Sequence, residues 1–157
     1  MKKVILVLML CLVSALLTAC ASSGADTAAA APTAAPLAVD PDLSKLSGTV
    51  VYSQVYNMMY EPQAYVGKVI RIASCYSAYE DTERGVVYHA CVIPDATACC
   101  AQGIEFVWRG EHQRPDDYPQ DGTDIIVTGR LESYYEDDLQ YLHLVDSEVL
   151  RQNEANT

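Results

Sequence analysis

The sequence contains six cysteines, and four of them lie between residues 75 and 100. They are Cys75, Cys91, Cys99 and Cys100, and His89 stands two positions before Cys91. Thiolates and imidazoles are preferred zinc ligands, and thiols outside the cytoplasm form disulfides. Side chains two apart on a strand point to one face, which would place His89 beside Cys91. The following loop could return Cys99 and Cys100 toward them, whereas the strand register could turn Cys75 to the opposite face.

Three interpretations of this cluster stay open. An even number of cysteines in an exported chain first indicates one or two structural disulfides, and a bond between adjacent Cys99 and Cys100 is the most strained pairing. A zinc site would use Cys91, Cys99 and Cys100 with His89 or Cys75, although adjacent ligands fit a tetrahedron poorly. Buried thiols without chemistry are the third interpretation, because free cysteine is among the most buried residue types.

Residues 1–19 have the pattern of a secretory signal peptide. Lys2 and Lys3 give a positive start, and an apolar run from Val4 to Leu17 follows. This run of about fourteen residues is shorter than the roughly twenty that a membrane-spanning helix needs. Small residues then precede a cysteine, as at a cleavage site. The sequence therefore predicts an exported protein whose signal helix is removed.

The segment Leu17-Thr18-Ala19-Cys20 resembles the lipobox of bacterial lipoproteins. That resemblance implies cleavage before Cys20 and a lipid chain on its sulfur. Several acyl chains on one residue anchor a protein stably, whereas one chain binds only marginally. We therefore expect Cys20 to hold the protein on the extracytoplasmic face of a cell membrane, with the lipid bilayer as its first partner.

Composition separates the rest of the chain into three parts. Residues 20–46 are rich in Ala and Pro and are predicted to form a flexible linker. Residues 47–150 are long enough for one modest core, and residues 151–157 are predicted to be a disordered tail. The formal charge of −11 becomes about −13 without Lys2 and Lys3. Such an acidic surface repels phosphate backbones and argues against a nucleic acid partner.

The pattern within residues 47–150 predicts an all-β domain with a short N-terminal helix. Val55, Met58 and Met59 have near-helical spacing, and Pro62 ends any helix there. β-branched and aromatic runs bounded by turn residues predict five strands. These are Lys68–Tyr79, Val86–Ile93, Gly103–Trp108, Asp124–Tyr135 and Leu139–Val145. Residues 109–122 are predicted to be a long surface loop, and Gly129 inside a strand predicts a bend or a close backbone approach.

Two groups of motifs resemble known bacterial proteins. The order Glu61-Pro62-x-x-Tyr65-x-Gly67-Lys68, followed much later by Val127-x-Gly129-Arg130, resembles OB-fold modules. His89-Ala90-Cys91 and Ala98-Cys99-Cys100-Ala101-Gln102-Gly103 resemble motifs of a group of uncharacterised OB-like lipoproteins, and more distantly of accessory subunits of bacterial permeases. The resemblance implies a small five-stranded OB-like barrel and no particular activity. The loop at 109–122 departs from the helix that many OB barrels have between strands three and four.

Other candidate residues are better explained without a site. Tyrosines in or beside strands could stack a base or a sugar, but we favour amphipathic strand residues with solvated hydroxyls; they are Tyr76, Tyr79, Tyr88, Tyr134, Tyr135 and Tyr141. The acidic runs Glu80-Asp81, Asp116-Asp117 and Glu136-Asp137-Asp138 lack the spacing of a calcium loop. His112 and His143 are predicted to be surface residues. No hydrolase or phosphate-binding motif is present.

The sequence therefore predicts a lipid-anchored, non-enzymatic binding or accessory domain that assists a membrane transporter or complex. The alternative is an extracytoplasmic lipoprotein that binds zinc through the Cys/His cluster. A remote alternative is a thiol-dependent enzyme with His89 as its base. No catalytic residue and no resident cofactor are expected, with zinc as the one candidate.

Overall fold

The computed structural model describes residues 38–154, and the predicted leader, Cys20 and most of the predicted linker lie outside this range. The domain consists mostly of sheet, with five strands and one α-helix, which confirms that part of the prediction. The helices are α2 (Gly48–Tyr60) and the single 3₁₀ turn η2 (Pro62–Ala64). The strands are β1 (Val69–Asp81), β2 (Val86–Pro94), β3 (Ala101–Trp108), β4 (Asp124–Glu136) and β5 (Leu139–Arg151).

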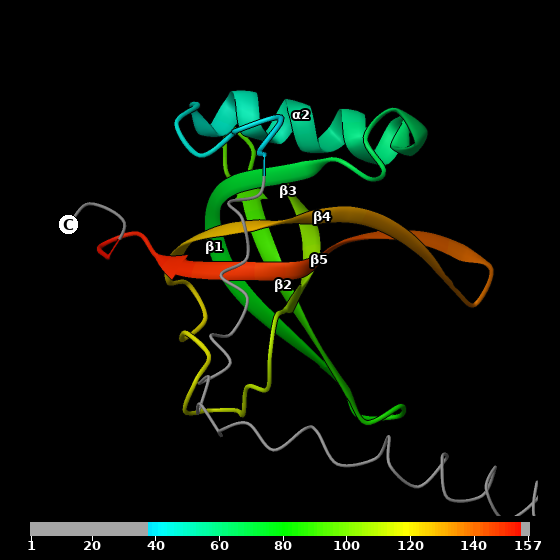
Figure 1. Cartoon of the computed structure of the whole chain (residues 1–157), viewed down its shortest axis with the longest axis vertical. Helices are drawn as coiled ribbons and strands as arrows, with labels where there is room; N and C mark the ends of the chain where they lie inside the picture. Colours follow the sequence, from blue (N-terminus) through cyan, green and yellow to red (C-terminus); the bar gives the residue numbers. More distant parts are fainter. Residues whose placement is uncertain (1–37, 155–157) are drawn as a thin grey trace, which may run out of the picture. The chain divides into compact units, whose positions relative to one another are not determined.

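The five strands close into a barrel in the order β1-β2-β3-β5-β4, with β4 paired to β1 (Figure 1). Four of the pairings are antiparallel, and the pairing of β3 with β5 is parallel. Alternation places Ile70, Ile72 and Tyr76 of β1 in the interior, where all three are almost fully buried. The core continues with Ile104 of β3 and Leu144 of β5.

Helix α2 covers one end of the barrel (Figure 1). Val51, Val55 and Met58 follow one another at helical spacing, and all three are buried in the core. The helix ends at Tyr60 because the residue before a proline avoids the helical conformation, and Pro62 follows Glu61.

The barrel domain begins earlier in the chain than predicted. Leu43, in the predicted linker, is 2 % exposed and belongs to the core. The backbone N–H of Leu43 donates to the carbonyl of Arg71 at 2.7 Å, so this segment lies along β1. At the other end, β5 runs to Arg151 rather than Val145, and residues 152–154 form a turn.

Gly129 confirms the predicted close approach of backbones. It lies at an irregularity in the β4–β5 register between Thr128 and Arg130. A Cβ at this position would overlap the Ser147 hydroxyl and lie 2.9 Å from Cβ of Leu144. The register shift and the absence of a side chain at Gly129 allow the backbones of β4 and β5 to lie close together at this point.

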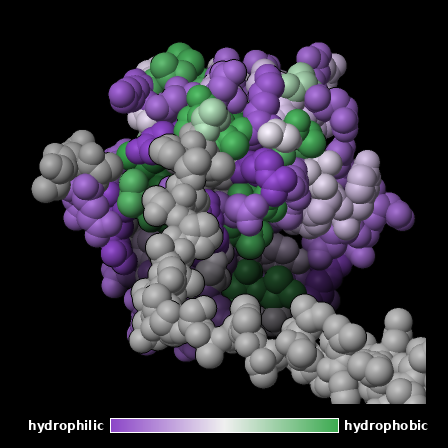
Figure 2. Space-filling model, viewed as in Figure 1, coloured by the Kyte–Doolittle hydropathy of each residue, from purple (hydrophilic) through white to green (hydrophobic). Residues whose placement is uncertain are grey.

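The surface of the domain on the side shown in Figure 2 is mostly hydrophilic, with separate hydrophobic spots between hydrophilic residues. No helix in the part of the chain that the structure describes has the length and apolar character needed to cross a membrane.

Candidate functional site

A groove of about 690 Å³ lies over the first residues of β2, the end of β3 and the loop at 109–122. It includes all three histidines, the single tryptophan and the single phenylalanine of the chain. The aromatic and imidazole rings that line it are Tyr88, His89, Phe106, Trp108, His112, Tyr118, Tyr134 and His143. Four strands and the loop at 109–122 thus bring their flat side chains to one concave surface.

Ring stacking holds the long loop against the barrel. Tyr118 of the loop lies on His89 of β2 with ring centroids 3.9 Å apart and planes 12° apart. His112 lies on Trp108 of β3 with centroids 3.9 Å apart and planes 14° apart. Tyr118 also meets the edge of Trp108 at 5.4 Å. Because both loop rings are stacked on strand residues, the loop forms a wall of the groove rather than a free segment.

His89 reaches into the barrel from this wall. Its Nδ1 and the Tyr76 hydroxyl are 2.7 Å apart and form a hydrogen bond. Burial lowers the pKa of His89 to about 4, and the positive charge of Arg114 acts in the same direction. Burial also raises the pKa of Tyr76. At neutral pH both groups are therefore uncharged, and the imidazole orients the neighbouring rings without adding charge to the groove.

Two carboxylates accept hydrogen bonds from tyrosines that line the groove. Tyr134 donates to Oε2 of Glu105 at 2.6 Å, and Tyr88 donates to Oε1 of Glu136 at 2.8 Å. The bond to Glu105 and burial of the phenol raise the pKa of Tyr134, with burial as the larger cause. Among the described residues that line the 690 Å³ groove there is no Lys or Arg. The groove therefore presents aromatic faces and hydrogen-bond acceptors with negative charge.

A second hollow of about 440 Å³ continues the groove toward the hairpin tips and shares Tyr88 and Glu105 with it. Arg84, in the β1–β2 turn, lies 3.3 Å from Oδ2 of Asp81 and 3.5 Å from Oε1 of Glu136. It also pairs with Asp137 in the β4–β5 turn. Arg84 thereby ties the two hairpins that flank this hollow.

The structure separates the predicted cysteine cluster. Cys91 lies opposite Tyr76 and Ile104 in the barrel interior and is fully buried, and burial raises its pKa to about 12. Cys75 precedes Tyr76 and so points to the other face, where burial and the charges of Asp124 and Asp121 raise its pKa. His89 is engaged with Tyr76 and Tyr118. All four described thiols are free, and the disulfides stay a prediction.

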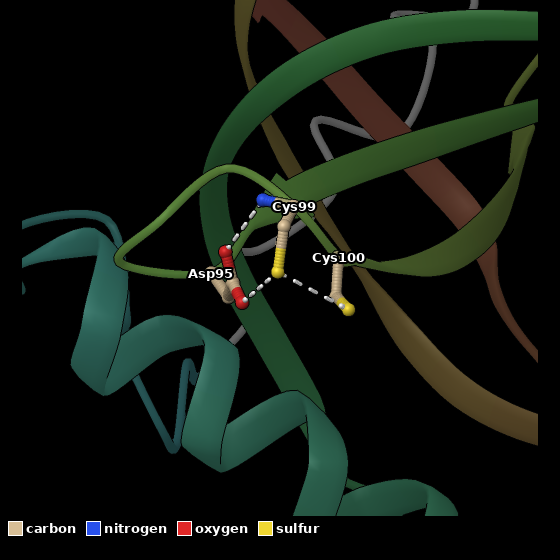
Figure 3. A group of neighbouring side chains, drawn as sticks. All are labelled: Asp95, Cys99 and Cys100. Atoms are coloured by element: carbon tan, nitrogen blue, oxygen red, sulfur yellow. Dashed lines mark hydrogen bonds between the residues drawn. The ribbon is translucent and has the colours of Figure 1, made fainter.

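Cys99 and Cys100 do come together, with a partner that the sequence analysis missed. Their sulfur atoms are 3.7 Å apart, and Cys99 Sγ is 3.5 Å from Oδ2 of Asp95 (Figure 3). Donor atoms of Asp95, Cys99 and Cys100 lie within 4.8 Å of one another. A local sequence pattern could have indicated this contact. An Asp that follows Pro94 and precedes Cys99 by four residues is typical of a tight turn in which the Asp carboxylate bonds to backbone N–H groups of the turn.

The aromatic wall was also missed in part. Tyr88 and Tyr134 were considered as a stacking face, whereas Trp108 and Tyr118 were not. His112 and His143 were predicted to be surface residues, and both are half-buried in ring contacts.

Comparisons with known proteins found no matching family model, no matching curated protein and no matching solved structure.

Proposed function

We propose that this chain is a lipid-anchored binding module with a ligand groove on an OB-type barrel. The observation that carries the proposal is the groove and its extension over β2 and β3, flanked by the β1–β2 and β4–β5 turns. In OB barrels the face over strands two and three, together with the same two loops, binds oligonucleotides and oligosaccharides. The strand order and the five-strand closure support this assignment.

The charge of the groove selects between these two ligand classes. The chain has a formal charge of −11, and the groove brings Glu105 and Glu111 to its surface. A polyanion would gain no counterion release from such a surface. An uncharged oligosaccharide fits better, because its ring faces stack on aromatic side chains and its hydroxyls donate to carboxylates. We therefore propose an uncharged glycan as the ligand class.

The anchor in this proposal is Cys20, and the support for it is the sequence of residues 1–20. An acidic domain has little attraction for anionic headgroups, so the acyl chains provide the membrane attachment. The module would then present its groove on the extracytoplasmic face, where it assists a membrane protein complex as a non-enzymatic accessory.

Tryptophan fluorescence can report binding in the groove. Trp108 is the only tryptophan of the chain and lines the groove, so its emission responds to an occupant. The full chain, purified in detergent, is titrated with cellohexaose, with chitohexaose and with a single-stranded oligonucleotide. We expect a saturable change in emission with a glycan and none with the oligonucleotide.

Two tyrosine variants test whether the glycan binds in the groove. Tyr134→Ala removes a groove ring, and loss of one stacking ring corresponds to about a tenfold weaker affinity or more. Tyr60→Ala removes a ring of α2 that is 76 % exposed and lies outside the groove, and the glycan affinity of this variant should be unchanged. Equal binding of the oligonucleotide, or glycan binding that is indifferent to Tyr134, would overturn the proposal.

A further inference from the structure

The loop between β2 and β3 holds a group of donor atoms that the groove does not use. It is formed by Asp95, Cys99 and Cys100, which follow the end of β2, whereas the groove is lined by the start of β2 and the end of β3. We infer that these three side chains bind one thiophilic divalent cation, with Zn²⁺ as the first choice. This site is separate from the groove and does not depend on its function.

Two of the three separations between the donors match those of a tetrahedral ion, and the third, between Cys100 and Asp95, lies within 4.8 Å. With Zn–S bonds of about 2.3 Å and a Zn–O bond of about 2.0 Å, a tetrahedron separates two sulfurs by about 3.8 Å and a sulfur from an oxygen by about 3.5 Å. The observed separations are 3.7 Å for Cys99 Sγ to Cys100 Sγ and 3.5 Å for Cys99 Sγ to Asp95 Oδ2. Adjacent cysteines thus reach two corners of one tetrahedron here, which the sequence alone argued against.

The two carboxylate oxygens of Asp95 have different partners. One accepts hydrogen bonds from the loop backbone, and the other faces the thiol of Cys99. Oδ1 accepts backbone N–H groups of Thr97 at 3.0 Å and of Cys99 at 3.1 Å. The backbone N–H of Asp95 donates to the carbonyl of Cys100 at 2.8 Å. Oδ2 faces Cys99 Sγ and the Thr97 hydroxyl. Figure 3 shows the Cys99 thiol between the Asp95 carboxylate and Cys100. Little rearrangement is then needed for an ion to replace these contacts.

The set differs from the zinc ligands that the sequence suggested. Cys91 is enclosed in the barrel core and His89 is stacked under Tyr118, so neither reaches the loop. Three protein donors leave the fourth corner of the tetrahedron to water or to a donor from a partner, as in open zinc sites. Both cysteines are exposed, so the ion is exchangeable. Binding converts two thiols to thiolates, and two protons leave for each Zn²⁺ bound.

Cobalt provides a direct test with the full chain. The protein is reduced, its free thiols are counted, and Co²⁺ is added without oxygen. We expect a sulfur-to-cobalt charge-transfer band and tetrahedral d–d bands that saturate at one ion per chain. Addition of Zn²⁺ should remove both bands, and proton release should accompany the Zn²⁺ titration.

Three variants and a matched control identify the ligands. Cys99→Ser or Cys100→Ser should weaken Zn²⁺ binding on the order of a hundredfold. Asp95→Asn keeps the acceptor for the loop hydrogen bonds but loses the charged donor, and it should weaken binding about tenfold. Cys75→Ser removes a thiol outside the loop and should leave binding unchanged. The site is overturned if the reduced chain gives no charge-transfer band, if Cys75→Ser matches Cys99→Ser, or if Cys99 and Cys100 are isolated as a disulfide that resists reduction.

Discussion

The imidazole of His89 lies face to face with the ring of Tyr118, with centroids 3.9 Å apart, while its Nδ1 is bonded to the Tyr76 hydroxyl inside the barrel. One side chain of β2 therefore joins the barrel interior to the loop at 109–122. Any change in the charge of His89 acts on both at once.

Acidification should weaken the fold through His89. Its pKa is about 4 in the folded protein and about 6.5 in an unfolded chain, so between these values the unfolded state binds the additional proton. Stability is therefore fully present above pH 6.5 and falls as the pH decreases toward 4. Because the ring is only partly buried, we expect a loss of about 1–2 kcal/mol rather than the full value of the shift. Urea denaturation across this pH range measures it.

The variant His89→Phe separates this effect from the titration of carboxylates in the same range. Phenylalanine keeps the stack on Tyr118 but cannot ionise and leaves the Tyr76 hydroxyl without its partner. The variant should be less stable at pH 7 and should show a smaller decrease between pH 6.5 and 4. Parallel decreases in the two proteins would contradict the assignment to His89.

Gly129→Ala should destabilise the barrel by about 2 kcal/mol or more. The added Cβ would overlap the Ser147 hydroxyl and lie 3.0 Å from the carbonyl oxygen of Val145, so β4 and β5 must move apart. The matched control is Gly103→Ala in β3, where the nearest atom would be 3.8 Å away. That variant should be neutral or slightly more stable. Urea midpoints that are equal for the two variants would show that β4 and β5 separate at little cost.

The sequence predicted the ends of strands correctly where a run of β-branched or aromatic residues is followed or preceded by turn residues. β2 begins at Val86 and β3 ends at Trp108, as predicted. β5 was predicted to stop at Val145, and the polar residues Asp146-Ser147-Glu148 follow it. The strand continues to Arg151, because Asp146 has a φ of 51° and Ser147 is buried against Gly129. This contact joins residues that are far apart in the sequence, so a local sequence pattern cannot indicate it.

The site was less predictable because it depends on register and on a loop. The alternation of β2 correctly placed His89 and Cys91 on one face, and that face is the interior of the barrel, where Cys91 is buried as one of the three interpretations of the cysteines expected. Register turned Cys75 away, an alternative that the sequence left open. Tyr118 was not expected to contribute, because nothing in a Pro-rich acidic segment indicates which ring packs on the barrel.

Arg84 should matter more for the motion of the hairpins than for overall stability. It pairs with Asp81, Glu136 and Asp137, but its side chain is 41 % exposed, and exposed ion pairs contribute less than about 1 kcal/mol. Arg84→Gln should leave the urea midpoint almost unchanged and increase amide hydrogen exchange at residues 82–85 and 137–138. A control at Arg151, which pairs only with Glu154 among the described ion pairs, should leave exchange at both turns unaltered. Unchanged exchange in Arg84→Gln would show that the hairpins are held without it.

The thiols should differ widely in reactivity. Cys99 and Cys100 are exposed, whereas Cys91 is fully buried with a pKa raised to about 12, and alkylation requires an accessible thiolate. Iodoacetamide at pH 8 should label the exposed pair first and Cys91 only at the rate of global unfolding. Peptide mass spectrometry gives the order. Recovery of Cys75 and Cys91 in one disulfide-linked peptide would instead support the structural disulfides that the sequence predicted.

The parallel pairing of β3 with β5 has a consequence for how the protein matures. β5 is the last strand along the chain and pairs with both β3 and β4, so each of these has an open edge until β5 docks. Open edges are templates for aggregation, and pairings between distant segments form slowly. The groove needs Glu105 of β3 and His143 of β5, which are register partners. The surface proposed to bind a ligand is therefore complete only once β5 has docked, and an occupant would protect the completed barrel from proteolysis.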